Sequence, residues 1–255
     1  MDRKTKEFPA LGVSPIVEAT CQVNFALEKP LTREEAKDLA TRFFPEFKHN
    51  GDIFSESIAV EKKDPSKPPT QIRHQQNWTG VRFIRGSRVI TIFQDGLAYG
   101  IMSPYPNDDS FFDEVINTMK IAEEKIPDKA ITRIGLRFIN RLPVGEGRCG
   151  RLKDVLVTLP ETPQKIGEAE PARFLYQDCF FDRKTGVSTV VNRVYPANDP
   201  SAPNKPMIIL DIDSFVTPQK CLATEEFEAS LDMLRTAVNT MFFGSVGDKM
   251  MEVFK

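Results

Sequence analysis

Residues 131–144 alternate between apolar side chains and polar or small ones, and this pattern constrains the fold more than any other segment. Successive side chains of a β-strand point to opposite faces, so a period of two predicts a strand with two unlike sides. One side would carry Ile134, Leu136, Phe138, Asn140 and Leu142, and the other Arg133, Gly135, Arg137, Ile139 and Arg141. We expect the first side to pack on helices. The second should present a row of guanidinium groups that stay charged at any ordinary pH.

Residues 207–215 carry the complementary pattern. Asp211 and Asp213 alternate with apolar residues, so both carboxylates should point away from the helices, with α carbons about 6–7 Å apart. Glu18 should lie on the polar side of another alternating strand, at residues 16–27. If these three strands are neighbours, arginines and carboxylates line one polar sheet surface.

Three interpretations of this polar surface remain open. Cross-strand Arg–Asp pairs could simply fix the strand order and cover a solvated face. The arginines could instead hold a phosphate, a carboxylate or an acidic partner segment. In the third interpretation Asp211 and Asp213 hold a Mg²⁺ ion, although the sequence shows no obvious third acid for it.

The order of elements predicts an α+β protein with a mainly antiparallel sheet, or two such sheets, and long helices on one face. Each half, residues 1–128 and 129–255, is expected to read strand, helix, several strands, long helix, and the halves should pack as one globular unit. We predict strands at residues 16–27, 53–60, 80–85, 88–93, 97–102, 131–144, 174–182, 187–195 and 207–215. We predict helices at residues 32–44, 108–125, 151–157, 224–243 and 247–254, and exposed loops at 64–70, 160–171 and 196–206. The repeated order suggests an internal duplication, without residue identity to support it.

Composition bounds the class of protein. The chain has 255 residues, 40% hydrophobic and 27% charged, with a formal net charge of −2. These values are typical of a soluble globular protein and exclude disordered, collagen-like and disulfide-scaffold classes. The near balance of charge makes nucleic acid an unexpected partner.

Cysteine and glycine patterns predict neither a metal nor a cofactor. The four cysteines form no Cys-x-x-Cys pair, and the two histidines, His49 and His74, add no zinc-site spacing. The spacing Gly145-x-Gly147-x-x-Gly150 lacks a parallel βαβ context and is interpreted as a loop. The N-terminus has no apolar signal core, and no stretch approaches the roughly 20 apolar residues of a membrane span. We therefore expect a cytoplasmic protein with reduced thiols and no membrane partner.

Several segments resemble a sporadically distributed prokaryotic family that is functionally uncharacterised. The matching segments are residues 15–19 (PIVEA), 44–45 (FP), 134–141 (IGLRFINR), 210–213 (LDID) and the helix at 227–243. The resemblance spans most of the chain in order, and residues 134–141 are its distinctive part. It implies an organisation but no activity, substrate or cofactor. Members of that family often carry a histidine near the position of Arg235, which argues against a shared catalytic histidine in this chain.

The sequence thus favours a non-catalytic binding or interaction protein with an arginine-bearing sheet face, and the question of enzymatic activity stays open. Its partner would be an anionic small molecule or a protein, and a homodimer that buries part of this face is a further expectation. The candidate ligand-binding residues are Arg133, Arg137, Arg141, Asp211, Asp213 and Glu18, and no catalytic residue is predicted. The alternative is a divalent-metal-dependent enzyme that acts on a phosphate-containing substrate through Asp211 and Asp213.

Overall fold

A nine-stranded antiparallel sheet forms the centre of the protein, in the strand order β2-β3-β4-β5-β1-β6-β9-β8-β7. The computed structural model describes residues 8–61, 71–125, 130–145, 149–159, 172–199, 202–218, 220–221 and 224–255. The predicted α+β class and antiparallel pairing are confirmed. The question of one sheet or two is also answered, because strands from both ends of the chain share a single sheet.

The elements follow the predicted order closely. The strands are β1 (Ile16–Phe25), β2 (Lys48–Glu61), β3 (Gln71–Arg85), β4 (Arg88–Phe93), β5 (Gly96–Met102), β6 (Ile131–Pro143), β7 (Phe174–Phe181), β8 (Ser188–Asp199) and β9 (Ala202–Val216). The helices are α1 (Arg33–Phe43), α2 (Asp108–Lys125), α3 (Leu152–Val155), α4 (Thr224–Ser245) and α5 (Asp248–Phe254). None of these helices combines the length and the apolar character that crossing a membrane requires.

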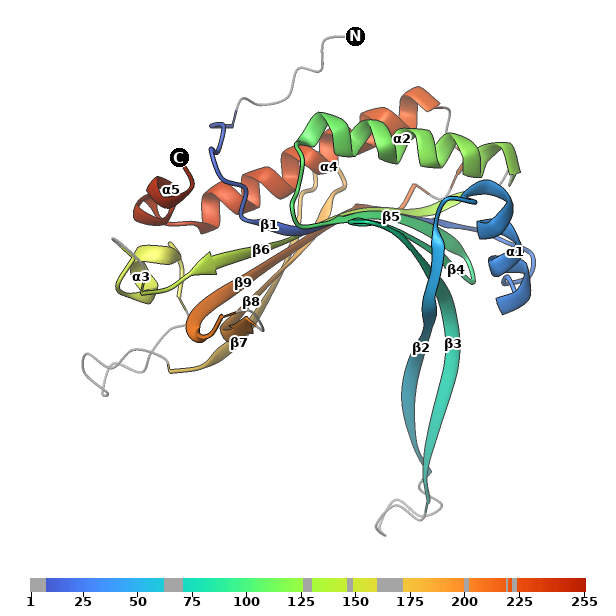
Figure 1. Cartoon of the computed structure of the whole chain (residues 1–255), viewed down its shortest axis with the longest axis horizontal. Coiled ribbons are helices and arrows are strands. Elements are labelled where there is room, and N and C mark those ends of the chain that lie inside the picture. Colours follow the sequence, from blue (N-terminus) through green and yellow to red (C-terminus); the bar gives the residue numbers. More distant parts are fainter. Residues whose placement is uncertain are drawn as a thin grey trace.

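The sheet is arched, and α2 and α4 lie over its convex side (Figure 1). Helix α2 contacts β5, and α4 contacts β6, β8 and β9. The β2–β3 hairpin and the β7–β9 strands bend away from these two helices at opposite ends of the arch (Figure 1). We call the concave side, opposite α2 and α4, the open face.

The buried core follows the alternation that the sequence shows. On β1, Ala19, Cys21 and Val23 are buried, while the residues between them are only partly covered. On β9, Leu210 and Ile212 are fully buried. Apolar side chains thus enter the layer between sheet and helices, which leaves their polar neighbours for the open face.

Helix α1 begins where its sequence predicts. Thr32 is its N-cap, and the backbone N–H of Thr32 donates to Oε2 of Glu35 at 2.8 Å. The backbone N–H of Glu35 donates to Oγ1 of Thr32 at 3.3 Å in return. This capping box satisfies two backbone donors that the helix itself leaves without partners.

Several predicted boundaries are wrong, and β2 begins at Lys48 rather than at residue 53. The expected loop at residues 196–206 is largely strand, because β8 continues to Asp199 and β9 begins at Ala202. Register shifts after Val194 and Ala197 let the pairing continue past Pro196, as β-bulges do. Strand β3 begins at Gln71 rather than Gly80, because its polar first part pairs with β2 in a hairpin. The predicted loops at 64–70 and 160–171 lie outside the described residues.

The burial of Cys21 gives a chemical test of which face β1 turns inward. Cys21 and Cys149 are buried, whereas Cys221 is exposed, and burial raises the pKa of the Cys21 thiol to about 12. Since the thiolate is the reactive form, iodoacetamide should modify Cys221 in the native protein and spare Cys21 and Cys149 until the chain unfolds. Mass spectrometry of the alkylated peptides measures this. Native modification of Cys21 at the rate of Cys221 would contradict the orientation of β1.

Candidate functional site

Strand β6 has the two unlike sides that its sequence predicts. Ile134, Leu136, Phe138, Asn140 and Leu142 are buried, whereas Arg137 is exposed and Arg133 and Arg141 are partly exposed. The strand lies between β1 and β9 at the middle of the sheet. The strands of Glu18, of the arginine row and of the two aspartates are therefore neighbours, which is the condition for one shared polar surface.

Arg137 forms a two-point ion pair with Asp211 on β9. Its Nε donates to Oδ1 at 2.7 Å, and its Nη2 donates to Oδ2 at 2.9 Å. The amide of Asn192 on β8 donates to the same Oδ2 at 3.1 Å. The Asp211 side chain is only 11% exposed, while that of Arg137 remains 47% exposed. The hydrogen bond to Asp211 raises the pKa of Arg137 further, so this cation is permanent.

Arg133 pairs with the other predicted carboxylate. Its Nη2 lies 2.8 Å from Oδ2 and 3.0 Å from Oδ1 of Asp213. Its guanidinium carbon lies 4.7 Å from the ring centroid of Phe215, within cation–π range. Burial raises the pKa of Asp213, and the positive charge of Arg133 opposes that rise.

Gly135 makes the Arg133–Asp213 pair possible. A Cβ atom at this position would lie 2.2 Å from Nη1 of Arg133 and 2.6 Å from its guanidinium carbon. The guanidinium therefore lies across the backbone of its own strand, where only glycine leaves room for it. The sequence pattern placed Gly135 on the same side as the arginines. It did not show that the missing side chain of Gly135 makes room for the Arg133 guanidinium.

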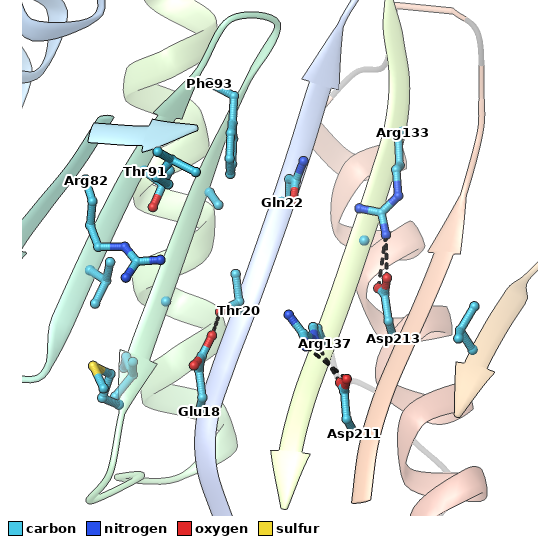
Figure 2. A pocket seen from close by; sticks show the side chains of 18 of the residues that line it. Glu18, Thr20, Gln22, Arg82, Thr91, Phe93, Arg133, Arg137, Asp211 and Asp213 are labelled. Atoms are coloured by element: carbon cyan, nitrogen blue, oxygen red, sulfur yellow. Dashed lines mark hydrogen bonds and ion pairs between the residues drawn. The ribbon is translucent and has the colours of Figure 1, made fainter. Parts of the chain in front are cut away.

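These side chains border a pocket of about 370 Å³ on the open face (Figure 2). Small residues leave space at the floor of the pocket. Gly100 lies opposite Thr20 on β5, and Ala98 and Gly135 lie on either side of Gln22. The polar lining comes from six strands and includes Glu18, Thr20, Gln22, Arg82, Thr91, Arg133, Arg137, Asn192, Asp211 and Asp213. Five of the six predicted site residues thus meet in one hollow.

Arg141 is the exception. It shares the strand face of Arg137 but lies near the end of β6, opposite Ile209, and does not line the pocket. An alternating pattern shows which face of a strand a residue lies on, but it does not show how far a site on that face extends along the strand. The inclusion of Arg141 in the same site is therefore not supported by its position.

Arg82 is the pocket residue that the sequence reasoning missed. It lies on β3 between the buried residues Val81 and Phe83, the same two-sided pattern that identified Arg137. Figure 2 shows Arg82 and Arg137 on either side of β1, with Glu18 and Thr20 between them. Within the described part of the chain, Arg82 makes no ion pair.

The charges in the pocket are therefore mostly cancelled. Arg137 neutralises Asp211, and Arg133 neutralises Asp213. Glu18 accepts a hydrogen bond from Oγ1 of Thr20 at 3.3 Å. Arg82 and Glu18 are the two charged lining residues that have no ion-pair partner among the described residues.

The geometry offers no ready set of metal ligands. Among the described residues, no three His, Cys, Asp or Glu side chains lie close enough together to hold a metal ion. Asp211 and Asp213 are each engaged by an arginine, which competes directly with a cation for the same oxygens.

A second cavity, of about 520 Å³, lies near the Arg235–Asp108 ion pair and the N-terminal segment. None of the six predicted site residues lines it. The pocket on the open face is therefore the candidate site.

No protein-family model matches the chain, and no curated protein matches its sequence. The resemblance to the sporadic prokaryotic family stays a prediction, and the function must be argued from the pocket itself.

We predict that Gly135→Ala displaces the Arg133 guanidinium without unfolding the sheet, because Gly135 has ordinary strand geometry and the clashing group is flexible. The loss of a partly exposed ion pair should cost about 1 kcal/mol or less. The pKa of Asp213 should rise further, since the opposing charge of Arg133 is withdrawn, and an NMR titration of the carboxyl measures this. Gly150→Ala is the matched control, because a Cβ there meets no atom within 4 Å. An unchanged Asp213 pKa in Gly135→Ala would contradict this role.

Proposed function

We propose that the protein is a binding protein that holds an anionic group on its open face, between Arg82 and Arg137. The observation that carries the proposal is Arg82, a cation that borders the pocket without an ion-pair partner among the described residues. Arg137 adds to it, because its bonds to Asp211 use Nε and Nη2 and leave Nη1 available. Two guanidinium groups on either side of one hollow are typical of carboxylate and phosphate recognition.

The size of the pocket favours a small ligand, or one side chain of a partner protein, over a broad protein surface. About 370 Å³ lies near the lower end of the range for small-molecule sites. Glu18 lies between the two arginines and adds a hydrogen-bond acceptor (Figure 2). The best-fitting ligand is therefore an anion that also carries a hydrogen-bond donor.

The metal-dependent enzyme alternative receives no comparable support. Its two carboxylates, Asp211 and Asp213, already accept hydrogen bonds from arginines. A Mg²⁺ ion would have to break both ion pairs and then find further oxygen ligands. Nothing in the pocket favours that exchange over the present pairs.

We further infer that residues 1–128 and 129–255 are two similar halves of one globular unit. In each half the first strand pairs with the last, β1 with β5 and β6 with β9, and the two first strands pair with each other. The last long helix of each half, α2 or α4, lies over the same side of the sheet (Figure 1). This repeated order supports an internal duplication, with the pocket across the junction between the halves.

Arg82→Ala tests the proposed function most cleanly, because Arg82 is exposed and its removal leaves no carboxylate without a partner. Calorimetric titration with inorganic phosphate and with citrate should show roughly tenfold weaker binding, about 1.4 kcal/mol. Arg137→Ala should weaken binding as well. Arg42→Ala on α1, an exposed arginine in a local ion pair, should change nothing. Unaltered anion affinity in a folded Arg82→Ala protein, or no binding of either anion by the wild type, would refute the proposal.

Asp211→Asn separates the proposed function from the metal-enzyme alternative by the sign of its effect. The substitution removes a negative charge beside Arg137 but keeps an oxygen that can accept its hydrogen bond. Phosphate should therefore bind several-fold more tightly, whereas a Mg²⁺ site would be weakened. Titrations of both ions into both proteins measure this. Weaker phosphate binding together with the loss of a wild-type Mg²⁺ response would favour the enzyme.

A further inference from the structure

Strand β7 ends the sheet with an unusual concentration of exposed apolar side chains. It pairs with β8 on one side and has no strand on the other in the described part of the chain. Of the nine large hydrophobic side chains exposed in that part, four lie on this eight-residue strand: Leu175, Tyr176, Phe180 and Phe181. Leu175 is 77% and Phe181 64% exposed.

The edge lacks the charges that normally prevent edge-to-edge association. Asp178 is the only charged residue of β7, and its Oδ2 accepts a hydrogen bond at 2.6 Å from Nη1 of Arg193 in the same chain. The opposite edge of the sheet, β2, carries Lys48, Asp52 and Glu56. Edge strands protected by charge stay single, whereas an apolar edge with free backbone groups is a template for another strand.

We propose that two copies of this chain associate through β7, whose strands pair in an antiparallel manner about a two-fold axis at Asp178. This interface is separate from the proposed ligand site and does not depend on it. The second copy is indicated by the order of residues in the strand, which is self-complementary about that axis. In this register Leu175 faces Phe181 of the second copy, and Tyr176 faces its Phe180.

Each pair joins side chains from the same face of the sheet. Tyr176 lies opposite Arg193, whose other strand neighbour is the buried Leu210, so Tyr176 and Phe180 lie on the helix side. Leu175 and Phe181 lie on the open face. Aromatic and aliphatic cross-strand pairs therefore form on both faces at once, and such pairs stabilise a sheet.

The two Asp178 side chains can meet at the two-fold axis only because Arg193 neutralises each of them. Two Asp178 carboxylates face each other there, and like charges in that position repel. Each is neutralised by the guanidinium of its own chain, which is itself buried. Moving the register by two residues in either direction would break both apolar pairs.

A dimer formed through β7 would not bury the arginine-bearing face. The sequence had suggested instead a dimer that buries part of this face, which is the open face of the sheet. In the arrangement proposed from β7, the two sheets continue into each other and both pockets remain uncovered, since their centre lies at β1 and β6.

Sedimentation velocity of the full chain tests the proposal. The wild type should dimerise with rising concentration, and Leu175→Glu should weaken dimerisation at least tenfold, because it places a charge opposite Phe181 of the second copy. Val157→Glu is the matched control, since Val157 is also 64% exposed but lies outside the sheet. The double variant Leu175→Glu/Phe181→Lys should restore the dimer through two cross-strand ion pairs.

The proposal fails if the wild type stays monomeric throughout, or if Leu175→Glu dimerises as well as the wild type. It also fails if the charge-swapped double variant remains monomeric while circular dichroism shows it folded. Circular dichroism and the phosphate titration of each variant distinguish a lost interface from a lost fold or a lost ligand site.

Discussion

The ion pairs between β6 and β9 determine what the open face can be. These two strands bury their other sides beneath α4, so their polar sides are committed to the concave surface. Asp211 and Asp213 are only partly exposed, and a partly buried carboxylate needs a partner. Arg137 and Arg133 supply those partners, and the pairs hold the guanidinium groups in fixed positions above the sheet.

Glycine and other small residues turn this ordered surface into a hollow. Gly135 lets the Arg133 guanidinium lie flat, and Gly100 and Ala98 leave the floor beside β1 without bulky side chains. With two Arg–Asp pairs cancelled, Arg82 and Glu18 provide the charge that a ligand can meet. The same pairs join β6 to β9 and hold the Arg137 guanidinium in place, which is the arrangement that the proposed function uses.

The sequence predicts the local elements well because their signals are local. Alternation predicted β6 and the sides of Asp211 and Asp213, and the Thr32–Glu35 spacing predicted the start of α1. Strand order is a long-range property, so the positions of β3 beside the pocket and of β7 at the edge could not be derived. Arg82 could have been found from its apolar neighbours Val81 and Phe83, which are buried. The exclusion of Arg141 from the pocket could be seen only in the three-dimensional structure. The prolines at residues 196–206 led to the wrong prediction of a loop, because strands with β-bulges tolerate proline.

A crystal structure of the wild-type protein grown with selenate would test the central claim most directly. Selenium is located by its anomalous scattering, and selenate has the charge and shape of the tetrahedral anions that arginine pairs bind. The account predicts a selenium peak on the open face within hydrogen-bonding distance of Arg82 and Arg137, with Arg137 still paired to Asp211. A pocket without selenate when other surface sites are occupied, or a β6 strand whose arginines face the helices, would contradict it.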